Sequence, residues 1–340
     1  MVILTTRIYF SAPRITNIQQ NTIQEMLSRW GLGTLHSYKP TEHGVMKQTL
    51  FIHTSTGDYV FKGNPLYPGQ WKEEQYMIQQ LKQHTKAPVP APYVIDSAED
   101  LFGYSYVIMP LLPGVHYHDL DKLALSEEEH QVILSKLAAA LLELHNWRTK
   151  EASEYDPETE DLRPFHQGLY SFSKEQILYW LEDAKKYSPI EDADMDWVHE
   201  KISAAESSFC DIEMYSFVMG DYKSENILIQ QNAGEWEVSG IIDFTTAYFG
   251  DPLADVVKFT TQLLWKGQQK RAAFFLSSYL QNADLPSTPY DISSRLSIHF
   301  LYSLILKWGE IHATGQYDNK NPLTFREFAS HHLDIVTSIY

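Results

Sequence analysis

The chain has 340 residues, of which 44% are hydrophobic and 13% aromatic. This length and composition predict about two domains or lobes with packed cores and exclude an intrinsically disordered chain. The 27 basic and 44 acidic residues give a formal charge of −17, which argues against nucleic acid and anionic membrane surfaces as partners, since both favour lysine and arginine.

A single cysteine, Cys210, excludes an intrachain disulfide and is typical of a reducing compartment. The first residues show no signal-peptide pattern, and no apolar run approaches the ~18 residues of a membrane span. We therefore expect a cytoplasmic protein without a membrane partner, either a monomer or a homodimer.

The first third of the chain is predicted to be rich in β-strands. Strands are expected at residues 50–54, 59–62 and 103–109. The first two flank a Ser-Thr-Gly-Asp turn at 55–58, which favours a hairpin. A helix is expected from Trp71 to His84, because prolines follow it at alternate positions.

The segment Pro110–Gly114 contains two prolines and a glycine and is predicted to be a non-helical connector. We place a boundary there, which divides the chain into an N-terminal lobe at 1–112 and a C-terminal lobe at 113–340.

The second lobe is predicted to be mainly helical. Ser126 and Glu129 form a capping box, and apolar residues follow at helical spacing from Ile133 to Leu144. The same box predicts that a helix begins at Ser173–Gln176, and the end of the chain from Leu253 is also expected to be helical. The acidic segment 151–161 is expected to be a surface loop. Two short strands, 227–229 and 238–242, form one hairpin. The predicted fold class is therefore α+β.

Three polar residues around that hairpin suggest phosphoryl transfer. Asp221 and Asn226 are five residues apart in Met-Gly-Asp-Tyr-Lys-Ser-Glu-Asn, and Asp243 follows the second strand. Phosphoryl transfer needs one carboxylate for the attacking hydroxyl, and a carboxylate and an amide to hold Mg²⁺ against the phosphates. We therefore predict Asp221 as the catalytic base, with Asn226 and Asp243 as metal ligands.

This block resembles the catalytic and metal loops of the aminoglycoside phosphotransferase family, whose pattern is His-Gly-Asp-x-x-x-x-Asn followed by Ile-Asp-Phe or Ile-Asp-Trp. The continuation Phe249–Asp255 resembles that family's Gly-Asp-Pro-x-x-Asp segment. The resemblance implies a bilobal, protein-kinase-like fold, with a small β-rich lobe before a larger, mainly helical lobe. It also implies ATP or GTP with Mg²⁺ as cofactors.

The resemblance extends to the first lobe. Lys62 ends a predicted strand, where kinase-like folds place the lysine that binds the α- and β-phosphates. Glu74 is its expected partner, and the resemblance favours it over Glu73. The adenine is expected to bind the backbone near Met109 and Leu111. The segment Thr41–Thr49 is expected to cover the phosphates, although it has only one glycine.

Two residues of the block, Met219 and Lys223, depart from the family's pattern. Met219 replaces the family's usual histidine, which leaves the geometry of the loop open. Lys223 stands two residues after Asp221, as in the catalytic loop of protein kinases. Lys223 either neutralises charge on the transferred phosphoryl group, as a second catalytic residue, or is simply solvated.

The acceptor is expected to be a hydroxyl of a small molecule, because the chain leaves no room for a peptide-docking activation segment after Asp243. The resemblance implies an aminoglycoside, another antibiotic-like compound, an amino alcohol or a sugar, and the acidic surface suits a cationic acceptor.

The pocket is expected between the insert Gln167–Ser208 and the C-terminal helices. Its candidate residues are Glu182, Asp183 and Glu310 as acids and Tyr302 and Trp308 as aromatic walls, although such acids are more often exposed helix charges and such aromatic residues are more often part of a core. A kinase-like binding or structural protein with little turnover remains the alternative.

Overall fold

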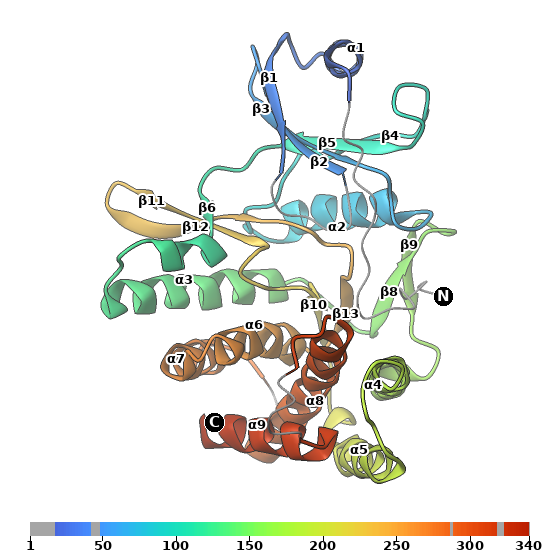
Figure 1. The fold of residues 1–340 in the computed structure, drawn as a ribbon, viewed down its shortest axis with the longest axis vertical. Coiled ribbons are helices and arrows are strands. Elements are labelled where there is room, and N and C mark those ends of the chain that lie inside the picture. Colours follow the sequence, from blue (N-terminus) through green and yellow to red (C-terminus); the bar gives the residue numbers. More distant parts are fainter. Residues whose placement is uncertain (1–17, 42–47, 286–287, 318–322, 340) are drawn as a thin grey trace.

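The computed structural model describes residues 18–41, 48–285, 288–317 and 323–339. Figure 1 shows a β-rich part above a larger part made mostly of helices. This arrangement confirms the predicted α+β, kinase-like fold. In the described residues no helix has the length and apolar character needed to cross a membrane.

The N-terminal part is a five-stranded antiparallel sheet in the order β1-β2-β3-β5-β4. Its elements are α1 Gln20–Arg29, β1 Leu35–Pro40, β2 Gln48–Thr54, β3 Asp58–Gly63, α2 Gln70–His84, β4 Val94–Asp96 and β5 Tyr106–Pro110. The predicted strands correspond to β2, β3 and β5, and the predicted helix to α2. The elements α1, β1 and β4 were not anticipated.

Residues of the sheet contribute to two separate apolar clusters, one on each face. Strand β2 alternates buried and half-buried positions over its whole length. Ile23, Met26 and Leu27 of α1 pack on Ile52 and other residues of one face. Helix α2 covers the opposite face and contributes buried side chains such as Met77 to the main core of the molecule (Figure 1).

The C-terminal part contains most of the helices. They are η1 Tyr117–Lys122, α3 Glu127–His145, α4 Gly168–Ala184, α5 Asp192–Ala204, η2 Glu206–Phe209, α6 Leu253–Trp265, α7 Gln269–Leu280, α8 Pro289–Ala313 and α9 Phe325–Ile339. The capping box of Ser126 and Glu129 begins α3 as predicted. The helix expected to begin at Ser173–Gln176 begins instead at Gly168, without a side-chain cap, so those residues lie inside α4.

Two further sheets occupy the C-terminal part. One joins β6 Val115–His116 to the predicted hairpin, which is β11 Ile227–Asn232 and β12 Glu235–Ile241. The other has the order β7-β10-β13-β8-β9. Its strands are β7 Arg148–Thr149, β8 Ser153–Asp156, β9 Asp161–Pro164, β10 Tyr215–Val218 and β13 Tyr248–Gly250.

The prediction of a surface loop at 151–161 was wrong, because this segment forms β8 and the start of β9. Burial explains the difference: Ser153, Tyr155 and Asp156 are buried. Arg163 of β9 neutralises the acids of β8, with its guanidinium nitrogens 2.8 Å from Glu154 and 3.1 Å from Asp156. The acidic composition therefore reflects cross-strand ion pairs rather than a solvated loop.

Candidate active site

The predicted catalytic loop leaves β10 at Val218 and enters β11 at Ile227. Its turn requires glycine at position 220, where φ is +76°. A Cβ atom there would stand 2.4 Å from the carbonyl oxygen of Thr246, closer than any side chain can approach. This glycine therefore lets the loop pass directly beside the segment that follows Asp243.

The loop backbone is anchored by Asp255, a fully buried residue in the first turn of α6. Its two carboxylate oxygens accept hydrogen bonds from the backbone amides of Met219 at 2.7 Å and Gly220 at 2.8 Å. Nε2 of His145 lies 3.3 Å from the same carboxylate. Because backbone amides carry this anchor, the loop is held without a histidine side chain at position 219.

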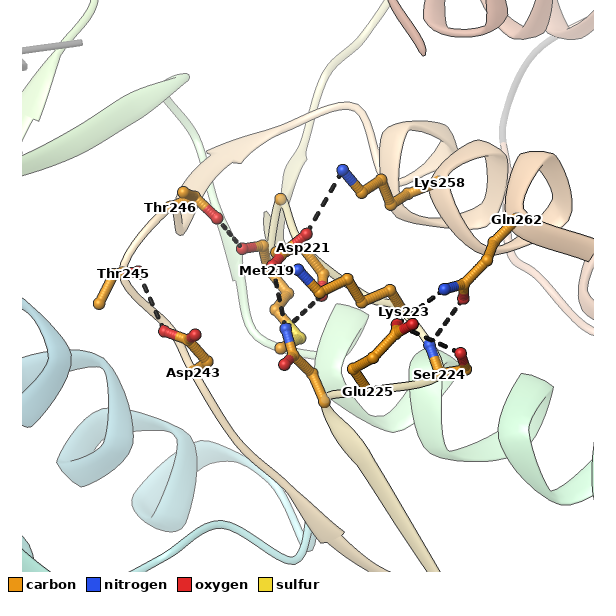
Figure 2. Close-up of polar contacts among 12 residues, drawn as sticks. Met219, Asp221, Lys223, Ser224, Glu225, Asp243, Thr245, Thr246, Lys258 and Gln262 are labelled. Atoms are coloured by element: carbon orange, nitrogen blue, oxygen red, sulfur yellow. Dashed lines mark hydrogen bonds and ion pairs between the residues drawn. The ribbon is translucent and has the colours of Figure 1, made fainter. Parts of the chain in front are cut away.

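Asp221 lies at the centre of the loop's polar contacts, as Figure 2 shows. Its Oδ2 is 2.6 Å from Nζ of Lys223 and accepts a hydrogen bond of 3.0 Å from Nδ2 of Asn226. Its Oδ1 is 3.3 Å from Nζ of Lys258, which α6 supplies. The structure therefore places Asp221, Lys223 and Asn226 together, as the sequence block predicts, and adds Lys258.

These neighbours decide the charge of the carboxyl group. Burial alone would raise the pKa of Asp221, but the ammonium groups of Lys258 and Lys223 outweigh it and lower that pKa below its ordinary value. Burial would likewise lower the pKa of Lys223, yet the Asp221 carboxylate raises it. Asp221 is therefore an anion near neutral pH, flanked by two cations.

Asp243 follows β12 in a left-handed conformation with φ of +73°. This conformation costs a residue other than glycine on the order of 1 kcal/mol, and such strain is concentrated at functional sites. Oγ1 of Thr245 donates a hydrogen bond of 3.0 Å to the Asp243 carboxylate. That carboxylate also acts electrostatically on Lys62, Lys223 and Asp221, so it faces the same polar centre.

Lys62 and Glu74 form a buried ion pair, with Nζ 3.1 Å from Oε1. The hydroxyl of Tyr93 and the backbone amide of Phe244 also donate hydrogen bonds to the Glu74 carboxylate. Glu73 instead accepts a hydrogen bond of 2.6 Å from the Tyr67 hydroxyl. Lys62 therefore pairs with Glu74, and the backbone amide of Phe244, the residue after Asp243, also contacts this pair.

The positions expected to bind adenine lie at β5 and just after it. Met109 is buried in β5, opposite Val60 of β3. The backbone amide of Leu111 donates its hydrogen bond to the carbonyl of Asp58 at 2.9 Å, so this group is engaged within the protein. Of the segment 41–49, which is expected to cover the phosphates, residues 42–47 lie outside the described residues.

The residues proposed for the acceptor pocket separate into different environments. Trp308 is fully buried and belongs to the core. Asp183 is buried against Lys186 at 2.8 Å, Glu310 pairs with Lys307 at 3.0 Å, and Glu182 is exposed. Their carboxylates therefore do not join the polar centre at Asp221.

Tyr302, the remaining candidate, is a half-buried residue of α8. Burial raises the pKa of its hydroxyl to about 12, and the Asp221 carboxylate contributes to the rise. The insert predicted to wall the pocket supplies α4, α5 and η2, which share a core cluster with α8 and α9.

Asn226 and Asp243 supply the amide and carboxylate oxygens that were predicted to bind Mg²⁺. Asn226 turns the nitrogen of its amide to Asp221, so the oxygen is the end left for a metal. Asp243 supplies a carboxylate, whose Oδ1 accepts the hydrogen bond from Thr245. Mg²⁺ keeps several waters and needs only one or two protein carboxylates. Within the described residues, no group of three or more His, Cys, Asp or Glu side chains forms a metal cluster of its own.

Sequence reasoning assigned no role to Asp255 and did not identify Lys258. Asp255 closes the quoted Gly-Asp-Pro segment, and Lys258 follows it by three residues, about one helical turn. That spacing is the only signal the sequence offers, because the contact of Lys258 with Asp221 joins positions 37 residues apart.

A model of the phosphotransferase enzyme family matches residues 37–288 of this chain. Among curated proteins, acyl-CoA dehydrogenase family member 10 of Mus musculus is 25% identical over 251 residues, which cover 70% of this chain and 22% of that protein. The chain spans between 22% and 33% of the length of the curated relatives it matches.

Solved aminoglycoside phosphotransferases share the fold. A thermostable mutant of APH(4)-Ia in complex with AMP-PNP and hygromycin B is 16% identical with a TM-score of 0.60, covering 94% of this chain and 97% of its own. The GDP complex of aminoglycoside 2'-phosphotransferase-IIIa is 16% identical with a TM-score of 0.58, covering 95% and 98%.

Proposed function

The chain belongs to the phosphotransferase enzyme family, and we propose that it transfers the γ-phosphoryl group of ATP or GTP to a hydroxyl of a small molecule. The observation that carries this proposal is the position of Asp221. It lies on a loop anchored by Asp255, and its carboxylate is ionised between two lysines and Asn226. Such a carboxylate can orient an attacking hydroxyl beside a metal-bound phosphate.

In the proposed reaction the acceptor hydroxyl donates a hydrogen bond to Asp221. The oxygen of the acceptor hydroxyl forms a bond to the γ-phosphorus as the bond between that phosphorus and the β-phosphate oxygen breaks. The hydroxyl proton passes to Asp221 late, and the nucleoside diphosphate leaves. Lys223 stabilises the transferred group, and Lys62 holds the α- and β-phosphates with Glu74 fixing its position.

Magnesium would be held by Asn226 and Asp243, and when bound it supplies positive charge that offsets the phosphates. Its presence would also explain the strained conformation of Asp243, since a metal ligand must be held in one direction. ATP and GTP both remain in the proposal, because the structural neighbours include complexes with AMP-PNP and with GDP.

The function test is turnover of ATP and of GTP with Mg²⁺ over a panel of hydroxyl compounds, including aminoglycosides, amino alcohols and sugars. We expect one class to accelerate diphosphate release and to yield a phosphorylated product by mass spectrometry. Nucleotide binding seen by thermal shift without turnover on any compound would instead support a kinase-like binding protein.

Replacing Lys62 by alanine is expected to raise the KM for ATP about 10- to 100-fold, because a charge-assisted contact to phosphate is worth roughly 1.5–3 kcal/mol. The change also leaves Glu74 buried, although Tyr93 and Phe244 still donate to it. Thermal unfolding should therefore be measured beside the kinetics.

Lys39→Ala is the matched control for Lys62→Ala, because Lys39 is an exposed lysine on β1 of the same sheet. It should retain the wild-type KM for ATP. Wild-type turnover by Lys62→Ala at low ATP would refute the phosphate role of Lys62.

A further inference from the structure

Lys258 is a cation that the proposed transfer of phosphate does not use. Its Nζ lies 3.3 Å from Oδ1 of Asp221, and its side chain is 34% exposed. Helix α6 carries both Lys258 and Asp255, the residue that anchors the catalytic loop. One rigid helix therefore sets both the loop and the lysine in position.

The two oxygens of Asp221 face different groups. Oδ2 contacts Lys223 and Asn226, the residues proposed for the γ-phosphate and the metal. Oδ1 faces Lys258. In Figure 2, Asp243 and Lys258 lie on opposite sides of Asp221. An acceptor hydroxyl that binds Oδ1 therefore arrives beside the Lys258 ammonium, on the side away from the proposed metal.

The charge on this acceptor side differs from the charge of the whole protein. The chain carries −17 overall, yet among the described residues the charged side chains in contact with Asp221 are two lysines, Lys223 and Lys258. Two of the three acids considered for a cationic acceptor are engaged elsewhere, since Asp183 pairs with Lys186 and Glu310 with Lys307, and the third, Glu182, is exposed. A cationic group next to the reacting hydroxyl would meet the ammonium of Lys258 and be repelled.

We propose that Lys258 selects an acceptor with an anionic group, a carboxylate or a phosphate ester, close to the hydroxyl that is phosphorylated. This inference rests on the proposed function and gives its acceptor a chemical class. The exposed ammonium can leave Oδ1 for the anion by rotation of its flexible stem, while the hydroxyl takes its place on the carboxylate.

Four compounds with a common three-carbon skeleton separate the possibilities: glycerate, glycerol 3-phosphate, glycerol and 3-amino-1,2-propanediol. Their dissociation constants are measured by calorimetry on the full chain saturated with Mg²⁺ and AMP-PNP. At least one anion should bind about 10-fold or more tightly than glycerol, because one charge-assisted hydrogen bond changes a dissociation constant by about that factor. The amine should bind most weakly. Comparing the two anions identifies carboxylate or phosphate as the preferred group.

Two variants assign the preference to Lys258. Lys258→Met should remove most of the difference between the preferred anion and glycerol. Lys307→Met is the matched control, because it removes the same charge from another ion-paired helix residue; it should keep the difference intact. A Lys258 that only neutralised Asp221 would change the binding of all four compounds by the same factor.

Three results would overturn the inference. The amine could bind more tightly than either anion, or neither anion could bind measurably. The anion preference could also survive in Lys258→Met. Nucleotide turnover is measured on the same preparations over the broad panel. If the wild type turns over no nucleotide with any acceptor, the proposed function itself fails. If turnover occurs without an anion preference, only the role of Lys258 fails.

Discussion

An Asp221→Ala variant is expected to lose several decades of kcat while the affinity for ATP stays close to that of the wild type. The reason is the division of contacts around the loop. Asp221 contacts Lys223, Lys258 and Asn226, whereas the ion pair proposed to hold the nucleotide is Lys62 with Glu74. Positioning and proton transfer of this kind are each worth on the order of 10²–10⁴ in rate.

The ionisation of Asp221 supports this expectation. The two ammonium groups hold its pKa below the ordinary value despite burial, so the carboxylate is ionised near neutral pH and needs no activation there. Its contribution is therefore mainly orientation of the hydroxyl, which suits a loose transition state that needs positioning more than deprotonation.

The measurement is single-turnover and steady-state kinetics with the acceptor found in the panel, beside nucleotide binding by calorimetry. Asp284→Ala is a suitable control, because Asp284 is 83% exposed and pairs with Arg148, and it should leave kcat unaffected. Near-normal kcat in Asp221→Ala would remove the centre of the proposed mechanism.

The central block could be predicted because its residues are close in sequence. Asp221 and Asn226 share one loop, and a single hairpin separates them from Asp243. The Lys62 and Glu74 pair is similarly local, since one strand end and the next helix supply it. The match to the phosphotransferase enzyme family confirms the predicted family, and the structure confirms the predicted fold class.

Contacts between distant segments could not be predicted in this way. The five-stranded sheet of the C-terminal part pairs β8 with β13 and β7 with β10, and each pair joins segments at least 60 residues apart. Three of the pairings in this sheet, β10 with β13, β10 with β7 and β13 with β8, involve only two or three positions each. Such short pairings are too few in residues to give a periodic pattern in the sequence. The contact of Lys258 with Asp221 could not be predicted for the same reason, because only the packing of α6 against the loop brings the two residues together.

At the acceptor region the overall charge and the local charge have opposite signs. A charge of −17 favours a cationic acceptor, but net charge describes the whole surface and not the groups in contact with one carboxylate. At Asp221 those groups are Lys223 and Lys258. The resemblance to antibiotic-modifying enzymes and the local charge therefore point to different acceptors, and the four-compound comparison decides between them.

The second large effect is expected from Asp243→Asn, which should lower kcat with Mg²⁺ by about 10³-fold or more, since metal-assisted charge stabilisation is worth several kcal/mol. The substitution is well suited to the site, because asparagine tolerates the left-handed conformation that Asp243 adopts at φ of +73°. It keeps the shape and the contact with Thr245, so the loss measures the charge rather than the fold.

Three measurements define that result: the unfolding temperature, turnover against Mg²⁺ concentration, and turnover with Mn²⁺. We expect an unfolding temperature near that of the wild type and a higher metal concentration for half-maximal rate. Partial rescue by Mn²⁺ is expected as well, because Mn²⁺ binds amide and carboxylate oxygens more tightly than Mg²⁺. Asp284→Asn, which makes the same chemical change at an exposed position, should show none of these effects. Unchanged turnover of Asp243→Asn in Mg²⁺ would rule out Asp243 as the metal ligand. Loss of folding together with turnover would instead assign Asp243 a structural role in holding Thr245 and Phe244 beside Glu74.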